Sequence, residues 1–419
     1  MNSLPSRFQR ITAFRNPLVK RLERLRTSKE ARQEEGHVLV QGIKTLEELA
    51  SKGHHRIRTI GITFDEHNLP IRSPALDIVA NVRRQELEDE GSNRGSSIAA
   101  KASAATAAAA ARSPQRRQEK IFQADQFVAM SRSLTTKILG TDSPSGEHEV
   151  WAEVAIPNYD HLFSIQDNTT TIDTTTTTTA AATPGFKARN STQRSKEVSL
   201  PQSPCTDIQR LLVLDQILDP GNMGLIVRSA KAFSWDAAWH TPGTVDQYNN
   251  KVVRASRALC LDWPTKTGSW KELEKFVERK DLTLLVADMV PGWISDRAVS
   301  DAIPPSTSVQ DNNDFNPYNL VWWNWPKSLP RTRVPERIAL VMSSEHHGVK
   351  GKAGSFDKED QGAKARLLSR AIRVSIPMNP DVESMNVAAA ATAMMWELNR
   401  VIDEGKRGPS KLQVFDTSE

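Results

Sequence analysis

Cysteine is scarce in this sequence, and long apolar runs are absent. The 419 residues include two cysteines, Cys205 and Cys260, and neither lies in a CxxC or Cys/His spacing. This pattern argues against a disulfide scaffold and a structural zinc site, and it suits a reducing compartment. No apolar run approaches the roughly 20 residues that cross a bilayer, and no secretory signal pattern is present. We therefore expect neither a membrane segment nor a metal site.

Charge of the two signs is nearly balanced. The chain has 55 Lys and Arg residues against 50 Asp and Glu, which gives a formal net charge of +5. A mildly basic chain suits a nucleic-acid partner, but many proteins without one share this balance. Residues 1–29 are more biased, because they hold eight Lys or Arg and the single acid Glu23. Such a bias is found in mitochondrial transit peptides, so it predicts a mitochondrial location, with the cytoplasm as the alternative.

The same segment also has the pattern of a first helix in a folded domain. Leu18, Leu22 and Leu25 lie on one helical face, as in a helix that buries one side. A basic helix that binds RNA would have the same pattern. Arg21 and Arg24 are therefore candidate RNA contacts.

Changes in composition divide the chain into two α/β parts. They flank a Thr-rich stretch that has almost no apolar surface to offset the entropy of ordering. In the second part, strands that alternate with helices indicate a parallel sheet covered on both faces. We predict an N-terminal domain over 1–160 with a solvated insertion near 88–120, a linker over 161–206, a C-terminal domain over 207–405 with an insertion near 294–335, and a tail over 406–419.

Hydrophobic periodicity places the elements of both parts. The first part is expected to contain a helix over 18–34 closed by Gly36, a strand over 37–40, a helix from 43 to 50, a strand over 57–63, further structure over 127–139 and a strand over 150–156. The second is expected to contain strands over 211–214, 236–239, 282–287, 338–342 and 372–376, with helices near 225–233, 252–259 and 385–401.

Three stretches place polar residues directly after predicted buried strands. They are Leu211–Ser234 (LLVLDQILDPGNMGLIVRSAKAFS), Leu340–Val349 (LVMSSEHHGV) and Ile376–Glu397 (IPMNPDVESMNVAAAATAMMWE). The carboxyl ends of parallel strands are where ligands bind in such sheets. Taken singly, Ser and Asn at a helix start are explained by capping.

Together these stretches resemble the SpoU, or TrmH-like, family of RNA ribose 2'-O-methyltransferases within the SPOUT superfamily. The resemblance covers roughly residues 207–403, and Thr244–Ser256 also looks like the family's spacer between its first two motifs. A weaker resemblance over 11–157 is to the family's small α/β substrate-binding domain, where Gln41 stands in place of an expected acidic residue. The matching motif residues are Asp219, Pro220, Asn222, Gly224 and Arg228; Glu345 and Gly348; and Ile376, Pro377, Met378, Glu383, Ser384 and Asn386.

The resemblance implies a fold, a cofactor and a partner. The fold is an α/β C-terminal SPOUT domain with a parallel sheet and a deep trefoil knot, preceded by a small N-terminal α/β substrate-binding domain. The cofactor is S-adenosylmethionine (AdoMet), and the substrate is an rRNA or a tRNA. Family members work as homodimers, with the site built at the subunit interface.

The resemblance also implies roles for particular residues. A ribose 2'-hydroxyl is a weak nucleophile that must be deprotonated or strongly polarised as it attacks the methyl group. Arg228 is the catalytic candidate, because a guanidinium can hold a phosphate and a hydroxyl together. Asn222, Glu345, Ser384 and Asn386 are expected to complete the catalytic set. The residues expected to bind the cofactor are Ser343, Ser344, Gly348, Ile376, Met378, Ser384 and Met385.

The sequence departs from the family pattern at three positions. Ser343 stands where a glycine is usual beside the cofactor, and a side chain there would crowd the approach of the backbone. Ala258 and Ser234 also replace expected glycines. These departures leave the predicted fold intact and bear on cofactor affinity.

Other candidates carry weaker signals. His346 and His347 follow Glu345 without further ligands at metal spacing, which is typical of a solvated loop rather than a metal site. Lys251 and Arg254 are candidate contacts to RNA phosphates, although a solvated helix face has the same pattern. Tryptophans at 322, 323 and 325 could stack on bases or pack within the insertion.

Two functions from different classes fit this sequence. The first is an AdoMet-dependent RNA 2'-O-ribose methyltransferase. The second is a non-catalytic RNA-binding or ribosome-assembly factor on the same fold, because a fold alone does not establish activity. Binding of AdoMet discriminates between the two.

Overall fold

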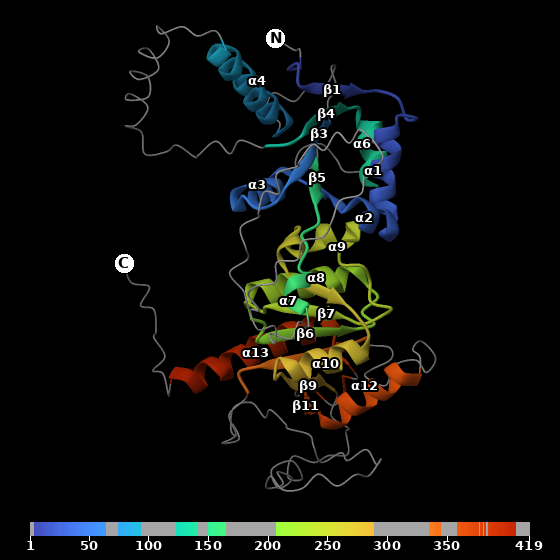
Figure 1. The fold of residues 1–419 in the computed structure, drawn as a ribbon, viewed down its shortest axis with the longest axis vertical. Helices are drawn as coiled ribbons and strands as arrows, with labels where there is room; N and C mark the ends of the chain where they lie inside the picture. Colours follow the sequence, from blue (N-terminus) through green and yellow to red (C-terminus); the bar gives the residue numbers. More distant parts are fainter. Residues whose placement is uncertain are drawn as a thin grey trace, which may run out of the picture.

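The chain folds into two α/β domains stacked along the long axis of the molecule (Figure 1). The computed structural model describes residues 4–63, 74–93, 123–140, 150–164, 207–288, 335–344, 358–376, 378–379, 381–382 and 384–407. Among these residues no helix is both long and apolar enough to cross a bilayer.

A five-stranded mixed sheet with the order β1-β4-β3-β5-β2 forms the centre of the N-terminal domain. β1 and β3 pair with β4 in parallel, whereas β5 pairs with β3 and β2 in antiparallel fashion. The strands are β1 (Phe8–Ile11), β2 (His37–Gln41), β3 (Ile57–Thr63), β4 (Gln126–Met130) and β5 (Val150–Ala155). The helices are α1 (Pro17–Thr27), α2 (Lys29–Glu35), α3 (Ile43–Lys52), α4 (Pro74–Asn93) and α6 (Arg132–Leu139).

Helices cover both faces of this sheet. α1 and α6 bury residues such as Leu22 and Ile138 against one face, and α3 and α4 bury Leu46 and Ile78 against the other. The helical alternative for the basic N-terminal segment is confirmed for residues 17–27, because Leu22 and Leu25 of α1 are buried in the fold.

The predicted helix over 18–34 is wrong in one respect, because it is two helices. Ser28 has an extended backbone with φ −110° and ends α1. Its hydroxyl accepts a hydrogen bond from the backbone N–H of Ala31 and so caps α2. A serine that satisfies the first free N–H groups favours a new helix start over continuation. Gly36 then ends α2 with a left-handed backbone, as predicted.

Three elements of the N-terminal domain were not predicted. β1 is a four-residue strand at the edge of the sheet, and α2 results from the break at Ser28. α4 continues to Asn93, so the insertion predicted from residue 88 begins later than expected. The rest of that insertion lies outside the described residues.

A six-stranded sheet with the order β11-β9-β10-β6-β7-β8 forms the centre of the C-terminal domain. Each of its described strand pairs is parallel, as predicted. The strands are β6 (Arg210–Asp215), β7 (Ala237–His240), β8 (Thr265–Thr267), β9 (Thr283–Ala287), β10 (Ile338–Ser343) and β11 (Ile372–Val374). The helical segments are α7 (Asp160–Phe163), α8 (Pro220–Ala232), α9 (Asn250–Ala255), the 3₁₀ turn η1 (Leu259–Asp262), α10 (Trp270–Arg279), α12 (Lys358–Arg370) and α13 (Val387–Arg407).

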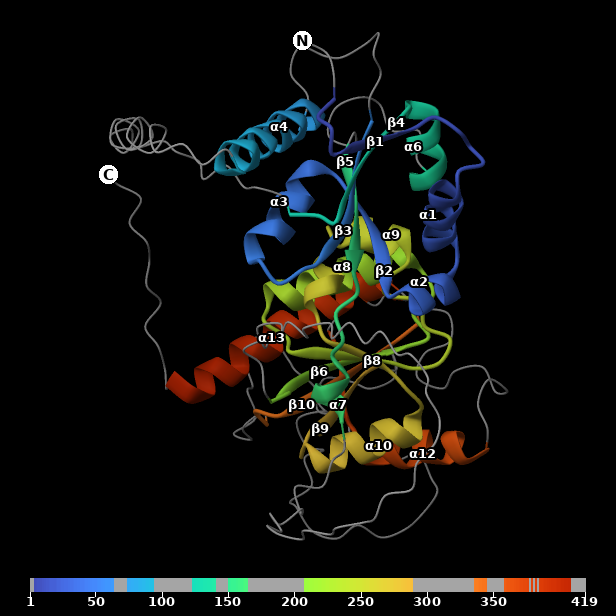
Figure 2. The ribbon, with the colours of Figure 1, turned by 45° about the horizontal axis from the view of Figure 1, so that its top comes forward.

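Two helical layers cover this second sheet, as Figure 2 shows. Leu212 and Leu214 of β6 face α8, α9 and α13, whereas Leu211 and Val213 face α10 and α12. Because successive side chains of a strand point to opposite faces, a strand covered on both sides must be apolar throughout. β6 is such a strand, since Leu211 to Leu214 are all fully buried.

The first residues of the predicted linker over 161–206 lie in the short helix α7. α7 is a single turn at the end of the N-terminal domain, and it packs on the C-terminal domain instead of on its own. Leu162 and Phe163 are buried there, and the Phe163 ring lies 5.6 Å from that of Phe276. These two apolar residues give the segment a reason to order that the Thr-rich stretch lacks. The remaining domain boundaries, both insertions and the tail stay predictions.

The helix α9 and its flanks join the two domains. Arg32 of α2, which is almost fully buried, donates two hydrogen bonds to Asp246 at 2.5 and 2.9 Å and a third to the carbonyl of Leu25. Asn250 donates to the carbonyl of Leu139 at 3.2 Å. A buried guanidinium needs all its partners, so these contacts fix the C-terminal domain against α2 and α6.

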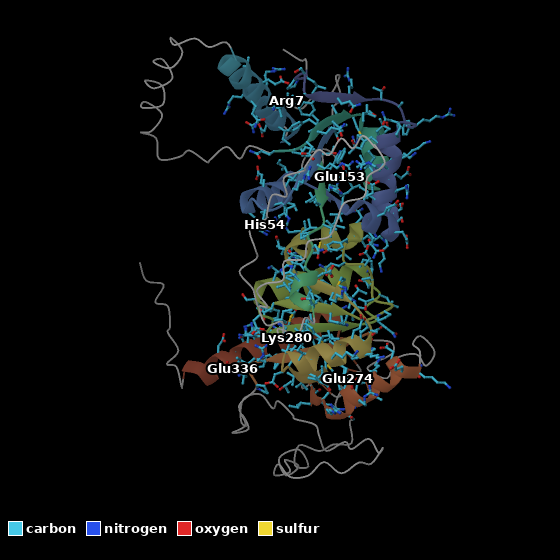
Figure 3. All side chains as sticks on the ribbon, in the orientation of Figure 1. Arg7, His54, Glu153, Glu274, Lys280 and Glu336 are labelled. Carbon is cyan, nitrogen blue, oxygen red and sulfur yellow. The ribbon has the colours of Figure 1, made fainter. Side chains whose placement is uncertain are left out.

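A buried carboxylate organises the interior of the N-terminal domain. Glu153 of β5, marked in Figure 3, is fully buried and accepts hydrogen bonds from both terminal nitrogens of Arg21 and from Thr59. Burial alone would raise the pKa of Glu153, but the hydrogen bonds and the charges of Arg21 and Arg58 outweigh it and lower this pKa below its ordinary value. Glu153 therefore stays ionised at neutral pH.

The closest packing in this sheet occurs at Gly61, and it generates a prediction. A Cβ atom at Gly61 would overlap the indole ring of Trp151, which is fully buried and unable to move aside. We expect Gly61→Ala to lower the free energy of unfolding by at least about 2 kcal/mol through overpacking, measured by urea denaturation of the full chain. Gly362→Ala in α12 is the control, because its nearest neighbour is a flexible Arg366 side chain at 3.4 Å. An equal loss in the two variants would contradict the packing argument.

Candidate active site

The register of the C-terminal sheet brings several strand ends to one edge. Ser343, the last residue of β10, pairs with Asp215, the last residue of β6. On the other side, β10 pairs with β9, which pairs with β11. Polar residues that are far apart in the sequence therefore meet at the carboxyl edge of four neighbouring strands, which is the ligand-binding edge of parallel sheets.

A pocket of about 140 Å³ lies at this edge. Six of the seven residues predicted to bind the cofactor line it, and they come from two separate stretches of the chain. The seventh, Gly348, lies outside the described residues. The lining residues are Ala287, Asp288, Met342, Ser343, Ser344, Ser375, Ile376, Met378, Ser384, Met385, Val387, Ala390 and Met394.

One polar atom in the pocket has no described partner. The Ser343 hydroxyl oxygen is buried and forms no hydrogen bond with any residue that the structure describes. A buried hydroxyl without a partner costs free energy, which makes Ser343 a candidate for a hydrogen bond to a ligand in this pocket. A side chain at this glycine position was expected only to crowd the site. Ser343 also places a hydrogen-bonding group there.

A buried ion pair lies directly behind the pocket. Lys364 of α12 donates to Asp215 at 2.9 Å, and the other carboxylate oxygen of Asp215 accepts from the Thr241 hydroxyl at 2.7 Å. The Lys364 ammonium also lies 5.0 Å from the centre of the Trp270 ring. The backbone N–H of Ser344 donates to the carbonyl of Asp215. The pair thus joins α12 to the strand ends that carry the pocket.

The N-termini of α8 and α13 meet beside this edge. Asp219 caps α8 by accepting from the backbone N–H of Asn222 at 2.7 Å. Asn386 caps α13 by accepting from the N–H of Ala388 at 3.0 Å, and its amide donates to the side-chain oxygen of Asn222 at 2.9 Å. Capping, the simpler explanation for Asn386, is therefore correct, and the same side chain also holds Asn222 in place.

Arg228 lies on the exposed face of α8. Within the part of the chain that the structure describes, it forms no ion pair or hydrogen bond, so its guanidinium is available to a ligand. Its predicted partner Glu345 lies outside the described residues, as do Glu383, His346 and His347. Ser384, also exposed, lines the pocket. The structure therefore brings Asn222 and Asn386 into contact and leaves the predicted Arg228–Glu345 pair a prediction.

The four predicted RNA contacts fall into two groups. Lys251 and Arg254 are exposed on α9 and line a cleft between the domains. Arg21 donates hydrogen bonds to the buried Glu153 and to Glu35, and its role as an RNA contact stays a prediction. Arg24 is exposed and lies 3.5 Å from Glu34. The helical pattern of α1 reflects the packing of its apolar face. Glu153, the buried partner of Arg21, lies 132 positions away, so a local sequence pattern cannot reveal this contact.

A second polar cluster was not predicted. His54 and His55, which follow α3, both approach one carboxylate oxygen of Asp262 in η1, at 3.0 and 2.6 Å. Lys52 binds the other oxygen. The three side chains that could ligate a metal are thus engaged in a contact between the domains, with an ammonium already neutralising the carboxylate. Burial would raise the pKa of Asp262, but hydrogen bonds from His55 and Lys52 and their charges lower it well below its ordinary range.

Two of the three departures from the expected glycines have a backbone consequence. Ser234 has φ 56° and Ala258 has φ 58°, both in the left-handed region that favours glycine. A residue with a side chain in that backbone region costs about 1–3 kcal/mol of conformational free energy. Ala258 is fully buried, so the packing around it offsets this cost. Neither residue lines the pocket.

The buried thiol Cys260 takes no part in the chemistry of this edge. Burial raises the pKa of Cys260 to about 12. The thiolate is the nucleophilic form, so Cys260 is inert at neutral pH.

Comparison with known proteins identifies the C-terminal domain. The fold matches a crystal structure of an AdoMet-bound rRNA methyltransferase from Sinorhizobium meliloti, with a TM-score of 0.53, 15% identity and coverage of 94% of this chain and 98% of that one. Residues 209–396 match the SpoU rRNA Methylase family. This part of the chain is therefore similar to that family, as the three motifs predicted.

Two curated relatives show how far the similarity extends. The chain is 22% identical over 260 residues to the 23S rRNA (guanosine(2553)-2'-O)-methyltransferase of Bacillus subtilis, covering 60% of this chain and 86% of that protein. It is 27% identical over 198 residues to the mitochondrial rRNA methyltransferase 3A of Danio rerio, covering 45% of this chain and 43% of that protein. The matched region therefore spans less than half of the zebrafish relative.

The unpartnered hydroxyl of Ser343 generates a prediction about the pocket. We expect Ser343→Ala to leave the unfolding free energy of the ligand-free protein unchanged or slightly raised, because no described hydrogen bond is lost. Loss of a hydrogen bond to AdoMet of about 1 kcal/mol would weaken binding roughly fivefold, as measured by calorimetry. Ser369→Ala is the control, since that hydroxyl already donates to the carbonyl of Arg366 on α12. Unaltered AdoMet affinity in Ser343→Ala would show that this hydroxyl does not face the cofactor.

Proposed function

We propose that this protein is an AdoMet-dependent RNA methyltransferase that transfers a methyl group to a ribose 2'-hydroxyl of an rRNA. The observation that carries the proposal is the convergence of six predicted cofactor residues on one pocket beside the Asn222–Asn386 pair. The match of residues 209–396 to the SpoU rRNA Methylase family and the names of both relatives support the same chemistry.

The residues of the pocket suit AdoMet. The side chains of Met342, Val387 and Met394 provide apolar walls, which suits the adenine ring. Ser343 and Ser344 provide hydroxyl and backbone groups for the polar atoms of the cofactor. The enclosed volume is smaller than the whole cofactor, so these residues would hold one part of it. When bound, AdoMet supplies an electrophilic methyl group on a sulfonium.

Arg228 is proposed to act on the RNA side of the site. Its exposed guanidinium can bind a phosphate oxygen next to the target ribose with charge-assisted hydrogen bonds, which fixes the 2'-hydroxyl in line with the methyl group. The permanent positive charge of arginine suits this positioning task better than the role of a base. The Asn222 amide, oriented by Asn386, is placed to bind the ribose, and Glu345 and Ser384 complete the proposed set.

A homodimer is proposed as the working form. Several large apolar residues near the site are exposed on α8, on α13 and on the segments that precede them. Leu225, 49% exposed, lies three residues before Arg228 and so on the same face of α8. Exposed apolar side chains on these elements are candidates for burial by a partner, and a second copy that covered them would bring Arg228 close to the partner's pocket. The exposed apolar residues are Leu218, Leu225, Val382 and Trp396.

The proposed location is the mitochondrion. The basic bias of residues 1–29 and the mitochondrial name of the zebrafish relative support this location. The Bacillus relative shows that the same domain also serves in bacteria, so the cytoplasm is the alternative.

The role of Arg228 can be tested by substitution. We expect Arg228→Ala to lower methyl transfer from labelled AdoMet to rRNA by at least about 100-fold, because the 2'-hydroxyl loses its positioning group. AdoMet affinity by calorimetry and the dimer mass by light scattering should be unchanged. Lys275→Ala, an exposed cation on α10, is the control. Full activity of Arg228→Ala would refute the assignment, and failure of the wild-type protein to bind AdoMet even with RNA present would favour the non-catalytic RNA-binding function.

A further inference from the structure

A second cavity is separate from the pocket described above. It is a cleft of about 710 Å³ between the start of α3 and the exposed side of α9. Gln41, Lys44 and Thr45 line it from the N-terminal domain, and Lys251, Arg254 and Arg257 line it from the C-terminal domain. Figure 1 places α9 between the two sheets, and Figure 2 shows it beside β2.

The charge of the cleft has one sign. Its lining contains four cationic side chains and no acidic one. Lys251, Arg254 and Arg257 follow one another at intervals of three residues, and all three are exposed, whereas Val252, Val253 and Ser256 are buried. Residues three apart share one helical face, so α9 presents Lys251 and Arg254 to the cleft, and Arg257 adds a third cation just after the helix ends at Ala255. The carboxylate of Glu48 lies outside the lining and binds Arg257 at 2.9 Å.

Gln41 contributes a neutral amide to the wall of the cleft. The resemblance of the N-terminal domain predicts an acidic residue at this position, and the glutamine is neutral. A carboxylate at the wall of the cleft would repel an anion, whereas an amide can donate hydrogen bonds to one. A neutral residue at this position therefore leaves this part of the cleft wall without negative charge.

The cleft has a fixed relation to the candidate active site. α9 packs on α8 so closely that a Cβ atom at Gly224 would overlap Ala255. Asn222 and Arg228 lie on that same helix α8. The domains on either side of the cleft are joined by the Arg32–Asp246 pair and by the contacts of Asp262 with Lys52, His54 and His55. These contacts fix the two walls of the cleft relative to each other. One wall is α9, which packs against the helix that carries Arg228.

We propose that this cleft binds the sugar-phosphate backbone of a single-stranded RNA segment that flanks the methylated nucleotide. The inference rests on the proposed function, which supplies RNA as the substrate. Several cations that line one groove are the feature that tracks successive phosphates of a single strand. Binding here places the flanking RNA across the domain boundary and the target ribose at α8.

The experiment measures RNA binding against salt concentration. The probe is a fluorescein-labelled oligouridine of about 20 nucleotides, longer than the site of a typical single-strand binder, and the readout is anisotropy between about 50 and 200 mM KCl. We expect the double variant K251E/R254E to raise the Kd at least about tenfold and to reduce the slope of log K against log salt by about 2, since each lost phosphate contact removes about 1. The control is K20E/K275E, which changes the net charge equally on two exposed residues outside the cleft, and it should stay within about twofold of wild type.

A second variant tests the location without changing charge. Thr45 lines the cleft, and Thr45→Cys in a C205S background gives an accessible thiol, because Cys260 is buried. A bulky maleimide on that thiol should abolish oligouridine binding and leave AdoMet binding unchanged. Unimpaired RNA binding by the labelled protein, or equal effects of K251E/R254E and K20E/K275E, would overturn the proposal.

The outcomes also separate this proposal from the proposed function. If the cleft variants lose RNA and the wild type binds no AdoMet, the cleft stands as an RNA site and the enzymatic function fails. If the wild type methylates rRNA and the cleft variants do so at wild-type rate and affinity, the enzymatic function stands and the cleft proposal fails.

Discussion

The buried ion pair between Lys364 and Asp215 is the contact on which the geometry of the candidate site depends. Both side chains are almost fully removed from water, with 10% and 1% exposure. Removing one partner of such a pair leaves an uncompensated charge at a cost of about 3–5 kcal/mol, so the two elements that carry them cannot separate independently. One is the end of β6, and the other is α12. Ser344 binds the carbonyl of the same Asp215, so the pair also fixes the turn that leaves β10 at the pocket wall.

The same constraint explains why the site lies where it does. Because β6, β10, β9 and β11 are parallel neighbours, their carboxyl ends share one edge, and the polar residues after each strand are concentrated there. α8 and α13 start at that edge and are joined by Asn222 and Asn386. The cofactor side and the substrate side of the proposed reaction therefore come from different elements that one sheet holds in register. The N-terminal domain contacts the C-terminal domain through α9 and its flanks. The exposed cations Lys251 and Arg254 of α9 line the cleft between the two domains.

Much of this arrangement could be predicted from the sequence, and particular residues show why. The runs at 211–214 and 338–342 are apolar at every position, as a strand covered on both faces requires, and both are strands of the parallel sheet. Two of the three motifs predicted the residues that line one pocket, because the resemblance supplied their long-range proximity. Short elements escaped prediction. β1 and β8 have four and three residues, too few to show a period, and they exist because neighbouring strands offer free hydrogen-bonding groups.

Contacts between distant residues were beyond the reach of local patterns. Arg21 had the appearance of a surface cation and is instead the partner of a buried carboxylate 132 positions away. Lys364 is part of no motif, yet it neutralises Asp215. The cleft between the domains forms where the start of α3 faces α9. The sequence therefore marked Lys251 and Arg254 as candidate RNA contacts but did not show that they line a cleft. The knot implied by the family resemblance stays a prediction, because parts of the chain next to the pocket lie outside the described residues.

The central claim is that a methyl group moves from AdoMet to a ribose 2'-hydroxyl, and the position of the transferred label tests it most directly. Purified protein is incubated with methyl-tritiated AdoMet and total rRNA, and the product is digested with alkali. A 2'-O-methyl group removes the hydroxyl that attacks the adjacent phosphodiester, so the account predicts that the label is recovered in alkali-stable dinucleotides. Recovery of the label in mononucleotides, which would indicate base methylation, or absence of label from the RNA would contradict the account.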